Sequence, residues 1–244
     1  MSNKKRYLVI GDIHGRTIWK DIIEKENPDK VIFLGDYVST HEGIPADQQL
    51  SNLEDILNYK EENPDKVILL RGNHDTQHLG YYWAECSGYD REVAFGMSSA
   101  EFLMRFTKLT DWVYIDDELK TIFSHAGVSR VWMEKILKES DVHNINDYGL
   151  REEFGFTPNW IYDCYGNSTT QPPTWIRPET LCTCNVEGWD QVVGHTPVAS
   201  DIVNLKKITK ENRNIWLCDA LGLSKYLLIE NGTFIPSSYE GQNQ

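Results

Sequence analysis

The sequence predicts an α/β fold with parallel strands, and two features carry this prediction. Short apolar strands alternate with longer helical segments through roughly the first third of the chain. In addition, the sequence Asn-Pro-Asp-Lys-Val occurs twice, at residues 27–31 and 63–67, each time between a predicted helix and a predicted strand. Two consecutive strand–loop–helix units that end in the same turn favour parallel pairing with right-handed crossovers.

Each element of this first part has its own signal. The strands are short apolar runs bounded by charged residues or glycine, at 7–10, 31–34 and 67–70. The helix predicted over 46–62 is amphipathic, with Leu50, Leu53, Ile56 and Leu57 at helical spacing. This helix and the shorter one over 19–26 both end at an Asn-Pro pair, because proline disfavours the helical conformation in the residue before it.

The rest of the chain shows weaker patterns. We expect helices at 78–87, 98–109 and 132–139, a hairpin of strands 113–115 and 119–123, and strands at 191–193, 199–205, 215–218 and 226–230. Residues 144–188 are rich in aromatic residues, glycine, proline and threonine, and form either a lid or substrate-facing insertion, or an aromatic core that covers the sheet edge. We expect residues 1–244 to form one domain, with 237–244 as a flexible tail.

The composition excludes some classes of function. The 244 residues carry a formal net charge of −13, with a pI near 5.0, whereas a nucleic-acid-binding surface needs a basic face. We therefore expect no nucleic-acid partner. No apolar run is long enough for a signal peptide or a membrane span, so we expect no membrane association. The five cysteines are irregularly spaced, which favours free thiols and a cytoplasmic location.

Five apolar strands end in the same way, with Asp, His or Asn beside a small residue. These ends are Gly11-Asp12-Ile13-His14-Gly15, Gly35-Asp36-Tyr37, Arg71-Gly72-Asn73-His74-Asp75, Ser124-His125-Ala126-Gly127 and Gly194-His195-Thr196. Open α/β sheets bind ligands at the carboxyl ends of their strands, and glycine allows the backbone to turn tightly there. One such segment would be an ordinary turn, but five on one pattern predict a functional site.

The side chains at these strand ends predict a metal centre. Six of them offer carboxylate, amide or imidazole donors: Asp12, His14, Asp36, Asn73, His125 and His195. This mixture suits divalent Mn, Fe or Zn, but it does not suit structural zinc, because no cysteine takes part. Six ligands are too many for one catalytic ion with an open position, whereas two ions bridged by Asp36 would use them all. Such a centre can clamp a transferring phosphoryl group and supply hydroxide at neutral pH.

The same five segments, in this order, closely resemble the motifs of the calcineurin-like metallophosphoesterase superfamily. The resemblance is greatest to the serine/threonine phosphoprotein phosphatase branch and its bacterial relatives, including diadenosine tetraphosphate hydrolases. It extends from Asp12 to His195, and five motifs in order are far more specific than one. It implies a four-layer α/β/β/α sandwich of two mixed β-sheets flanked by helices, the metallo-dependent phosphatase fold, with a dinuclear site at the strand C-termini.

The resemblance also assigns ligands to each of the two ions, which would be Mn or Fe, with Zn as a further option. One ion would be held by Asp12, His14 and Asp36. The other would be held by the bridging Asp36 together with Asn73, His125 and His195. A hydroxide that bridges the two ions would attack phosphorus directly, without a phosphoenzyme.

Two further residues receive roles from the resemblance. His74 would act as general acid and protonate the leaving alkoxide, as positioned imidazoles do. Arg71 would lie beside the site and bind a phosphate oxygen, because the guanidinium fork matches that geometry.

One motif departs from the family pattern. Phosphoprotein phosphatases continue the second motif as Gly-Asp-x-Val-Asp-Arg-Gly, in which the aspartate orients the catalytic histidine and the arginine binds phosphate. Here Ser39 and Thr40 occupy these two positions. Asp75 or Glu42 could take over the orienting role, and His41 could replace the lost donor, although His41 and Glu42 as plain loop residues are slightly favoured. The loss of a phosphate clamp is expected to shift substrate preference without abolishing the chemistry.

A replacement for the missing arginine is Arg177. The segment Trp175-Ile176-Arg177-Pro178 resembles the W-x-R-P sequence of bacterial members of the branch, in which the arginine reaches the phosphate. We therefore expect Arg177 to bind substrate. Trp175 could stack on a base or an aromatic group, although a packed tryptophan is the more frequent case.

Three functions are compatible with these residues. The first is a phosphatase that acts on phosphate monoesters, either in a phosphoserine/threonine protein or in a small phosphorylated metabolite. The second is a nucleotide phosphodiesterase or pyrophosphohydrolase of the dinucleoside polyphosphate type, in which the aromatic segment would hold the base. The third is a non-catalytic metal-binding module, which is disfavoured because all six ligands and His74 are intact.

Overall fold

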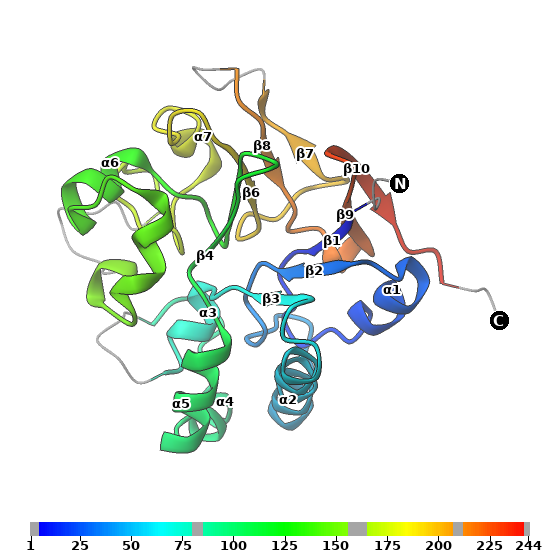
Figure 1. Cartoon of the computed structure of the whole chain (residues 1–244). Helices are drawn as coiled ribbons and strands as arrows, with labels where there is room; N and C mark the ends of the chain where they lie inside the picture. Colours follow the sequence, from blue (N-terminus) through cyan, green and yellow to red (C-terminus); the bar gives the residue numbers. More distant parts are fainter. Residues whose placement is uncertain (1–4, 80–84, 156–164, 207–211, 242–244) are drawn as a thin grey trace.

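The computed structural model describes residues 5–79, 85–155, 165–206 and 212–241, and its strands form two mixed sheets (Figure 1). The first sheet has the order β10-β9-β1-β2-β3, with bounds Thr233–Ser238, Lys225–Glu230, Arg6–Ile10, Lys30–Phe33 and Val67–Leu69. The second has the order β4-β5-β6-β8-β7, with bounds Val113–Asp116, Thr121–Ser124, Asp190–Val193, Ile215–Leu217 and Val203–Asn204.

Parallel pairing forms the middle of each sheet. Strands β1, β2 and β3 are parallel neighbours, and so are β5, β6 and β8, which confirms the pairing predicted for the first units. Antiparallel strands β9, β10, β4 and β7 complete the two sheets. Because parallel strands end at the same edge of a sheet, the loops after β1, β2 and β3 come together, as do the loops after β5 and β6.

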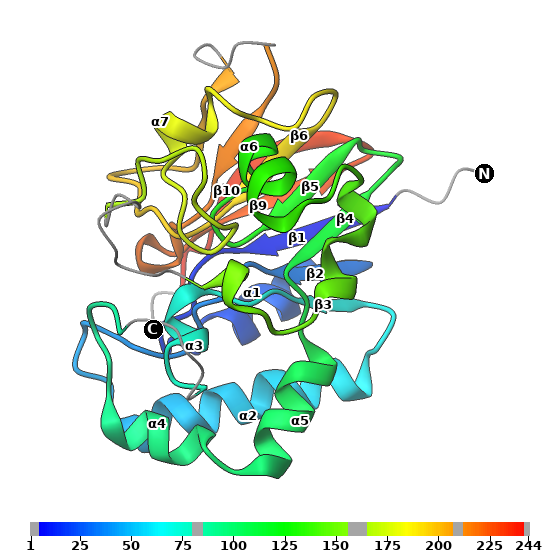
Figure 2. The same cartoon turned by 90° about the vertical axis from the view of Figure 1, so that its left-hand side faces the viewer.

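The core is layered because successive side chains of a strand point to opposite faces. In β1, Leu8 and Ile10 pack with residues of the helices, whereas Val9 packs in a second cluster with Phe123 and Val192 of the other sheet. The two sheets therefore meet face to face through this second cluster. Figure 2 shows helices on both outer sides of the stacked sheets. The predicted four-layer α/β/β/α sandwich is confirmed.

The helices cover the outer faces of the sheets. Their bounds are α1 Trp19–Glu26, α2 Ala46–Glu62, α3 Asn73–Thr76, α4 Arg91–Met97, α5 Ala100–Leu109, α6 Arg130–Trp132 and α7 Pro178–Leu181. A π-helical turn, Met133–Leu137, extends α6, and 3₁₀ turns cover Val142–Tyr148, Glu152–Phe154 and Leu221–Leu223. Helices α1 and α2 have the predicted bounds, and the predicted hairpin is present as β4 and β5.

Several local predictions are wrong. The helix expected at 78–87 is absent from its described residues, where His78 and Leu79 form a turn, and residues 80–84 lie outside the described part of the chain. Two short helices, α3 and α4, were not expected. The strand predicted over 199–205 has only two residues, Val203–Asn204. Strand β10 includes Ser237 and Ser238, the first residues of the expected tail.

The aromatic segment serves more than one purpose. Phe154 is fully buried and stacks on Trp112, with ring centroids 4.4 Å apart, so this part belongs to the core. Trp175 and Arg177, in contrast, lie beside His195 at the end of β6. Residues 156–164 of the segment lie outside the described part. Among the described residues, no helix is both long and apolar enough to cross a membrane.

Candidate metal centre

The six predicted ligands come from strand ends of both sheets. Asp12 and His14 follow β1, Asp36 follows β2 and Asn73 opens α3 after β3, while His125 and His195 follow β5 and β6. His14, Asp36 and His195 have positive φ angles of 46°, 52° and 61°. Such left-handed conformations are uncommon for residues other than glycine and cluster at functional sites. The turns therefore hold these side chains in orientations that an ordinary extended loop would not give.

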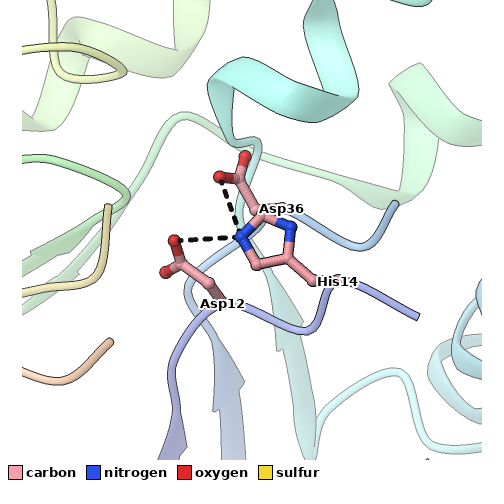
Figure 3. A group of neighbouring side chains, drawn as sticks. All are labelled: Asp12, His14 and Asp36. Atoms are coloured by element: carbon pink, nitrogen blue, oxygen red, sulfur yellow. Dashed lines mark ion pairs between the residues drawn. The ribbon is translucent and has the colours of Figure 1, made fainter. Parts of the chain in front are cut away.

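Asp12, His14 and Asp36 form the first half of the centre, and Figure 3 shows their side chains turned toward one another. His14 Nδ1 lies 3.1 Å from the Val38 carbonyl, which can only accept a hydrogen bond, so Nδ1 carries the proton. In the neutral ring, Nε2 then carries a lone pair, and it lies 3.9 Å from Oδ2 of both carboxylates. Three electron-pair donors thus face one another.

His125, Asn73 and His195 form the second half. His125 Nδ1 donates to the Leu34 carbonyl at 2.8 Å, so the lone pair of its Nε2 faces Asn73 Oδ1 at 2.9 Å and Asp36 Oδ2 at 3.4 Å. His195 Nδ1 also lies 2.9 Å from Asn73 Oδ1. Oδ2 of Asp36 is therefore shared by both halves, at the place where a bridging carboxylate is required.

The electrostatics of the centre fit a cation. Burial, followed by repulsion from neighbouring carboxylates, raises the pKa of Asp12 and Asp36 well above the ordinary value. Burial lowers the pKa of His14 to about 4 and that of His125 to about 3, so both imidazoles are neutral at pH 7. Buried carboxylates without a positive partner are unfavourable, and buried charges are normally paired or bound to metal. The residues present therefore fit divalent cations.

Hydrogen bonds from backbone N–H groups hold the carboxylates of Asp12 and Asp36 in position. Both oxygens of Asp12 accept from the His195 backbone N–H, at 2.9 and 3.1 Å, and Asp36 Oδ1 accepts from the His74 N–H at 2.8 Å. Glycines permit this close approach: a Cβ atom at Gly194 would lie 2.2 Å from Asp12 Oδ1. Residue 194 must consequently be glycine for the Asp12 carboxylate to keep its place.

We expect Gly194→Ala to lower the affinity for Mn²⁺ by about 10- to 100-fold, the usual effect of disturbing a group that positions a ligand. The added methyl group would displace the Asp12 carboxylate from its present position. Calorimetric titration with Mn²⁺ measures the effect. Gly241→Ala is the control, because its Cβ would meet only Tyr239, at 3.9 Å. Equal affinities of the two variants would contradict the positioning role of Gly194.

His74 lies at the edge of the centre. Its ring is 5.2 Å from that of His14 between centroids, and its Nδ1 lies 3.2 Å from Nε2 of Gln77. Burial and the neighbouring histidines lower the pKa of His74 to about 2. The predicted catalytic imidazole is thus next to the predicted ligands, and it is held by a residue that the sequence analysis did not single out.

Asp75 does not orient His74, which corrects the prediction of a catalytic role. Its carboxylate accepts from the backbone N–H groups of Asp36, Tyr37 and Gly72, at 2.8, 2.7 and 2.8 Å. Burial raises its pKa to about 7, against these three hydrogen bonds, which lower it. Asp75 therefore fastens the loop after β2 to the loop after β3. Glu42 does not reach His74 either, because it forms a two-pronged ion pair with Arg16.

Arg71 contacts the C-terminal end of α5. Its guanidinium donates to Thr110 Oγ1 at 2.7 Å and to the Thr107 carbonyl at 2.8 Å, and it lies over the Trp112 ring. The residue is only 4% exposed. Arg71 therefore anchors the C-terminal end of α5, and its expected contact with a phosphate oxygen stays a prediction.

Arg177 does lie beside the centre. Its Nη1 donates to Thr196 Oγ1 at 3.1 Å and to the His195 carbonyl at 3.4 Å. Burial lowers the pKa of Arg177, and the nearby carboxylates of Asp12 and Asp219 only partly oppose this shift. Trp175 packs on the His195 ring, with 5.3 Å between centroids, and is 9% exposed. His41 is exposed, with its ring 6.5 Å from that of His74, so its predicted substrate contact stays a prediction.

Three other residues lie at the centre and are not among the predicted ligand, catalytic or substrate-binding residues. Arg16 donates to the Asp12 carbonyl at 3.2 Å and thereby places a positive charge behind the first half. Asp219 forms a side-chain hydrogen bond with Asp12, and burial raises its pKa to about 6. Gln77 contacts His74, three residues earlier, a spacing that puts both on one side of a helical turn. That spacing was the one signal in the sequence that could have identified Gln77.

Comparison with known proteins agrees with this geometry. A model of the calcineurin-like phosphoesterase family matches residues 5–216. A cold-active protein tyrosine phosphatase aligns with a TM-score of 0.63 and 17% identity over 98% of this chain and 80% of that one. A Saccharomyces cerevisiae serine/threonine phosphatase similar to human phosphatase PP5 aligns with a TM-score of 0.63 and 12% identity over 100% of this chain and 82% of that one.

A third structure, provisionally assigned as a diadenosine tetraphosphatase, gives a TM-score of 0.52 and 15% identity over 98% and 96% of the two chains. No curated protein sequence matches the chain significantly. The structural neighbours are too distant in sequence to show more than a shared fold, whereas the family model covers most of the chain. The chain belongs to the calcineurin-like phosphoesterase family.

Proposed function

We propose that this phosphoesterase is a metal-dependent phosphatase that hydrolyses phosphate monoesters. The observation that carries the proposal is the position of Asp36 Oδ2, which lies 3.9 Å from His14 Nε2 and 3.4 Å from His125 Nε2. Both nitrogens present lone pairs to this oxygen, so two cations, one on each side, would satisfy the whole set. A carboxylate shared in this way is the arrangement that a dinuclear centre requires.

The residues divide into two ligand sets in this proposal. Asp12, His14 and Asp36 hold one ion, and Asp36 with Asn73, His125 and His195 holds the other. Bound divalent ions, Mn or Fe with Zn as a further option, supply hydroxide at neutral pH and neutralise the charge of the transferring phosphoryl group. Asn73 presents its oxygen to the centre because its Nδ2 donates to Cys86 Sγ at 3.3 Å.

The substrate would contact residues on opposite sides of the centre. His74 lies next to His14 and donates to the leaving oxygen. Arg177 lies next to His195 and is the positive group that binds a phosphate oxygen, in place of the arginine that Thr40 replaces. Trp175 packs on His195 with little exposed surface, which favours a compact phosphate ester over a nucleotide whose base needs an open aromatic face.

A panel of substrates tests the proposal with protein that has been stripped of metal and reloaded with Mn²⁺. The panel contains p-nitrophenyl phosphate, its bis-ester, phosphopeptides and a dinucleoside tetraphosphate. We expect metal-dependent turnover, with the monoesters preferred over the bis-ester and the tetraphosphate. His74→Asn should lower kcat by about 10²- to 10³-fold, the usual effect of removing a hydrogen-bond donor to an oxygen that gains charge.

The other outcomes separate the alternatives. Preference for the bis-ester or the tetraphosphate would replace the proposal by a nucleotide phosphodiesterase or pyrophosphohydrolase. If the protein binds two metal ions per chain but turns over none of the substrates, the proposal fails in favour of a metal-binding module. An unchanged kcat in His74→Asn would remove His74 from the mechanism.

A further inference from the structure

Gln77 contacts the imidazole ring of His74. Its side chain is 6% exposed and has four polar neighbours. Oε1 accepts from the Cys86 backbone N–H at 2.9 Å and from Cys86 Sγ at 3.1 Å. Nε2 lies 3.2 Å from Ser39 Oγ and 3.2 Å from His74 Nδ1. Both polar atoms of the Gln77 amide therefore have hydrogen-bonding partners.

The orientation of this amide is fixed by Cys86. A backbone N–H can only donate, so the atom that faces it must be the carbonyl oxygen of Gln77. The amide nitrogen is then the atom that faces His74 Nδ1, and an amide nitrogen can only donate. It follows that Nδ1 accepts a hydrogen bond and carries no proton. The proton of His74 consequently resides on Nε2, the other ring nitrogen.

This arrangement is opposite to the one that an aspartate partner would produce. A carboxylate accepts from Nδ1–H and stabilises the doubly protonated imidazolium, which is a strong proton donor. Ser39 stands where the family pattern has that aspartate, and here it is linked to Gln77 through its hydroxyl group. A neutral imidazole can polarise an oxygen through Nε2–H, but it does not readily give the proton away, because imidazolate would be left behind.

We infer that Gln77 is a positioning residue that holds His74 as a neutral Nε2–H donor, so that the enzyme prefers aryl phosphate monoesters to alkyl ones. The inference rests on the proposed phosphatase function. Attack by hydroxide forms a new P–O bond while the P–O bond to the leaving group breaks. The leaving oxygen takes the electron pair, departs as an anion hydrogen-bonded to His74, and is later protonated by water. A phenolate leaves more easily than an alkoxide, because the pKa of a phenol is about 10 and that of an alcohol is near that of water, about 15.7.

The proton position can be measured without any catalysis. In protein labelled with nitrogen-15 histidine, long-range proton–nitrogen correlation spectra distinguish the two neutral tautomers of each ring, and His74→Asn assigns the His74 signals. We expect the proton of His74 on Nε2, both in metal-free protein and in protein loaded with diamagnetic Zn²⁺. A proton on Nδ1, or on both nitrogens, would overturn the inference whatever the activity.

Gln77→Glu is the matched variant, because the carboxylate has the shape of the amide and still accepts from Cys86, while the Ser39 hydroxyl can turn to donate to it. It should add a second proton to His74, on Nδ1, so that the ring becomes an imidazolium that keeps its proton on Nε2. The ratio of kcat/KM for phosphoserine over phosphotyrosine peptides should then rise at least about tenfold, since full proton donation contributes about 10²- to 10⁴-fold. Gln77→Ala should lower kcat more than it raises KM, and should mix the tautomers.

These results separate the inference from the proposed function. If the protein hydrolyses no phosphoester while His74 carries its proton on Nε2, the phosphatase proposal fails and the assignment of the His74 proton stands. If the wild type hydrolyses phosphoserine and phosphotyrosine peptides equally well, or if Gln77→Glu leaves both the ratio and the protonation of His74 unchanged, the inference about Gln77 fails and the phosphatase stands.

Discussion

Replacement of Asp36 by asparagine is expected to lower phosphoesterase activity by about 10³- to 10⁴-fold and to leave the fold intact. Asp36 Oδ1 accepts from the His74 N–H at 2.8 Å, and an asparagine oxygen can keep this bond. The new amide group would then take the place of Oδ2 and face His14 Nε2 and His125 Nε2. Loss of the shared carboxylate removes a metal contribution of several kcal/mol, which corresponds to about 10³- to 10⁴-fold in kcat/KM.

The Asp36→Asn variant is also expected to affect the stability of the metal-free protein. In the metal-free wild type, the lone pairs of His14 Nε2 and His125 Nε2 face oxygen atoms. The amide N–H₂ introduced at position 36 can donate hydrogen bonds to these nitrogens, so the metal-free variant should melt no lower than the metal-free wild type. Asp55→Asn, an exposed carboxylate on α2, is the control for loss of a charge. Wild-type activity in Asp36→Asn, or retention of two Mn²⁺ ions per chain, would show that Asp36 does not join two ions.

Removal of the metal ions is expected to lower the melting temperature by roughly 8–16 °C. A ligand present at 1,000 times its dissociation constant stabilises the native state by about 4 kcal/mol. In a chain of this size each kcal/mol corresponds to about 2–4 °C. Calorimetric melting of the protein in excess Mn²⁺ and after chelation and dialysis measures the difference. In Asp36→Asn the difference should be much smaller, and an equally large one would place the stabilising ions elsewhere.

The difference in melting temperature should widen as pH rises. The pKa values of Asp12 and Asp36 are raised in the folded, metal-free protein. A carboxyl group of this kind stabilises the folded state below its unfolded pKa, near 3.8, and loses that contribution as pH rises through the folded pKa. Bound cations compensate the ionised carboxylates, so only the metal-free protein suffers this loss. Melting curves from pH 5 to 8 should therefore diverge, and parallel curves would contradict this account.

The layered fold and the six candidate ligands could be predicted because their signals are local. An apolar run followed by a small residue and a donor residue marks a buried strand and the turn at its end, and Asp36, His125 and His195 all follow this rule. The place where the strands come together follows from parallel pairing alone. Helix α4 was missed because it has only seven residues and contains Gly96, so that periodicity could not reveal it.

The roles of Arg71 and Asp75 could not be read from their neighbours in the sequence. Consecutive residues of a strand point to opposite faces, and consecutive residues of a helix point about 100° apart. Asn73 and Asp75 both lie in α3, yet Asn73 faces His125 while Asp75 faces the backbone of the loop after β2. The direction of each side chain depends on where the short helix begins, and the strand before it gives no sign of that position.

The pairing of β1 with β9, a strand more than 200 residues later in the chain, has a consequence for biosynthesis. Strand β1, whose end carries Asp12 and His14, pairs with β9, so that Tyr7 lies opposite Ile229. A nascent chain cannot form this pair until Ile229 has left the ribosome, and contacts between such distant residues form slowly. Stable metal binding is therefore expected only after β9 has been synthesised, and translation products that stop before β9 should fail to retain the metal ions.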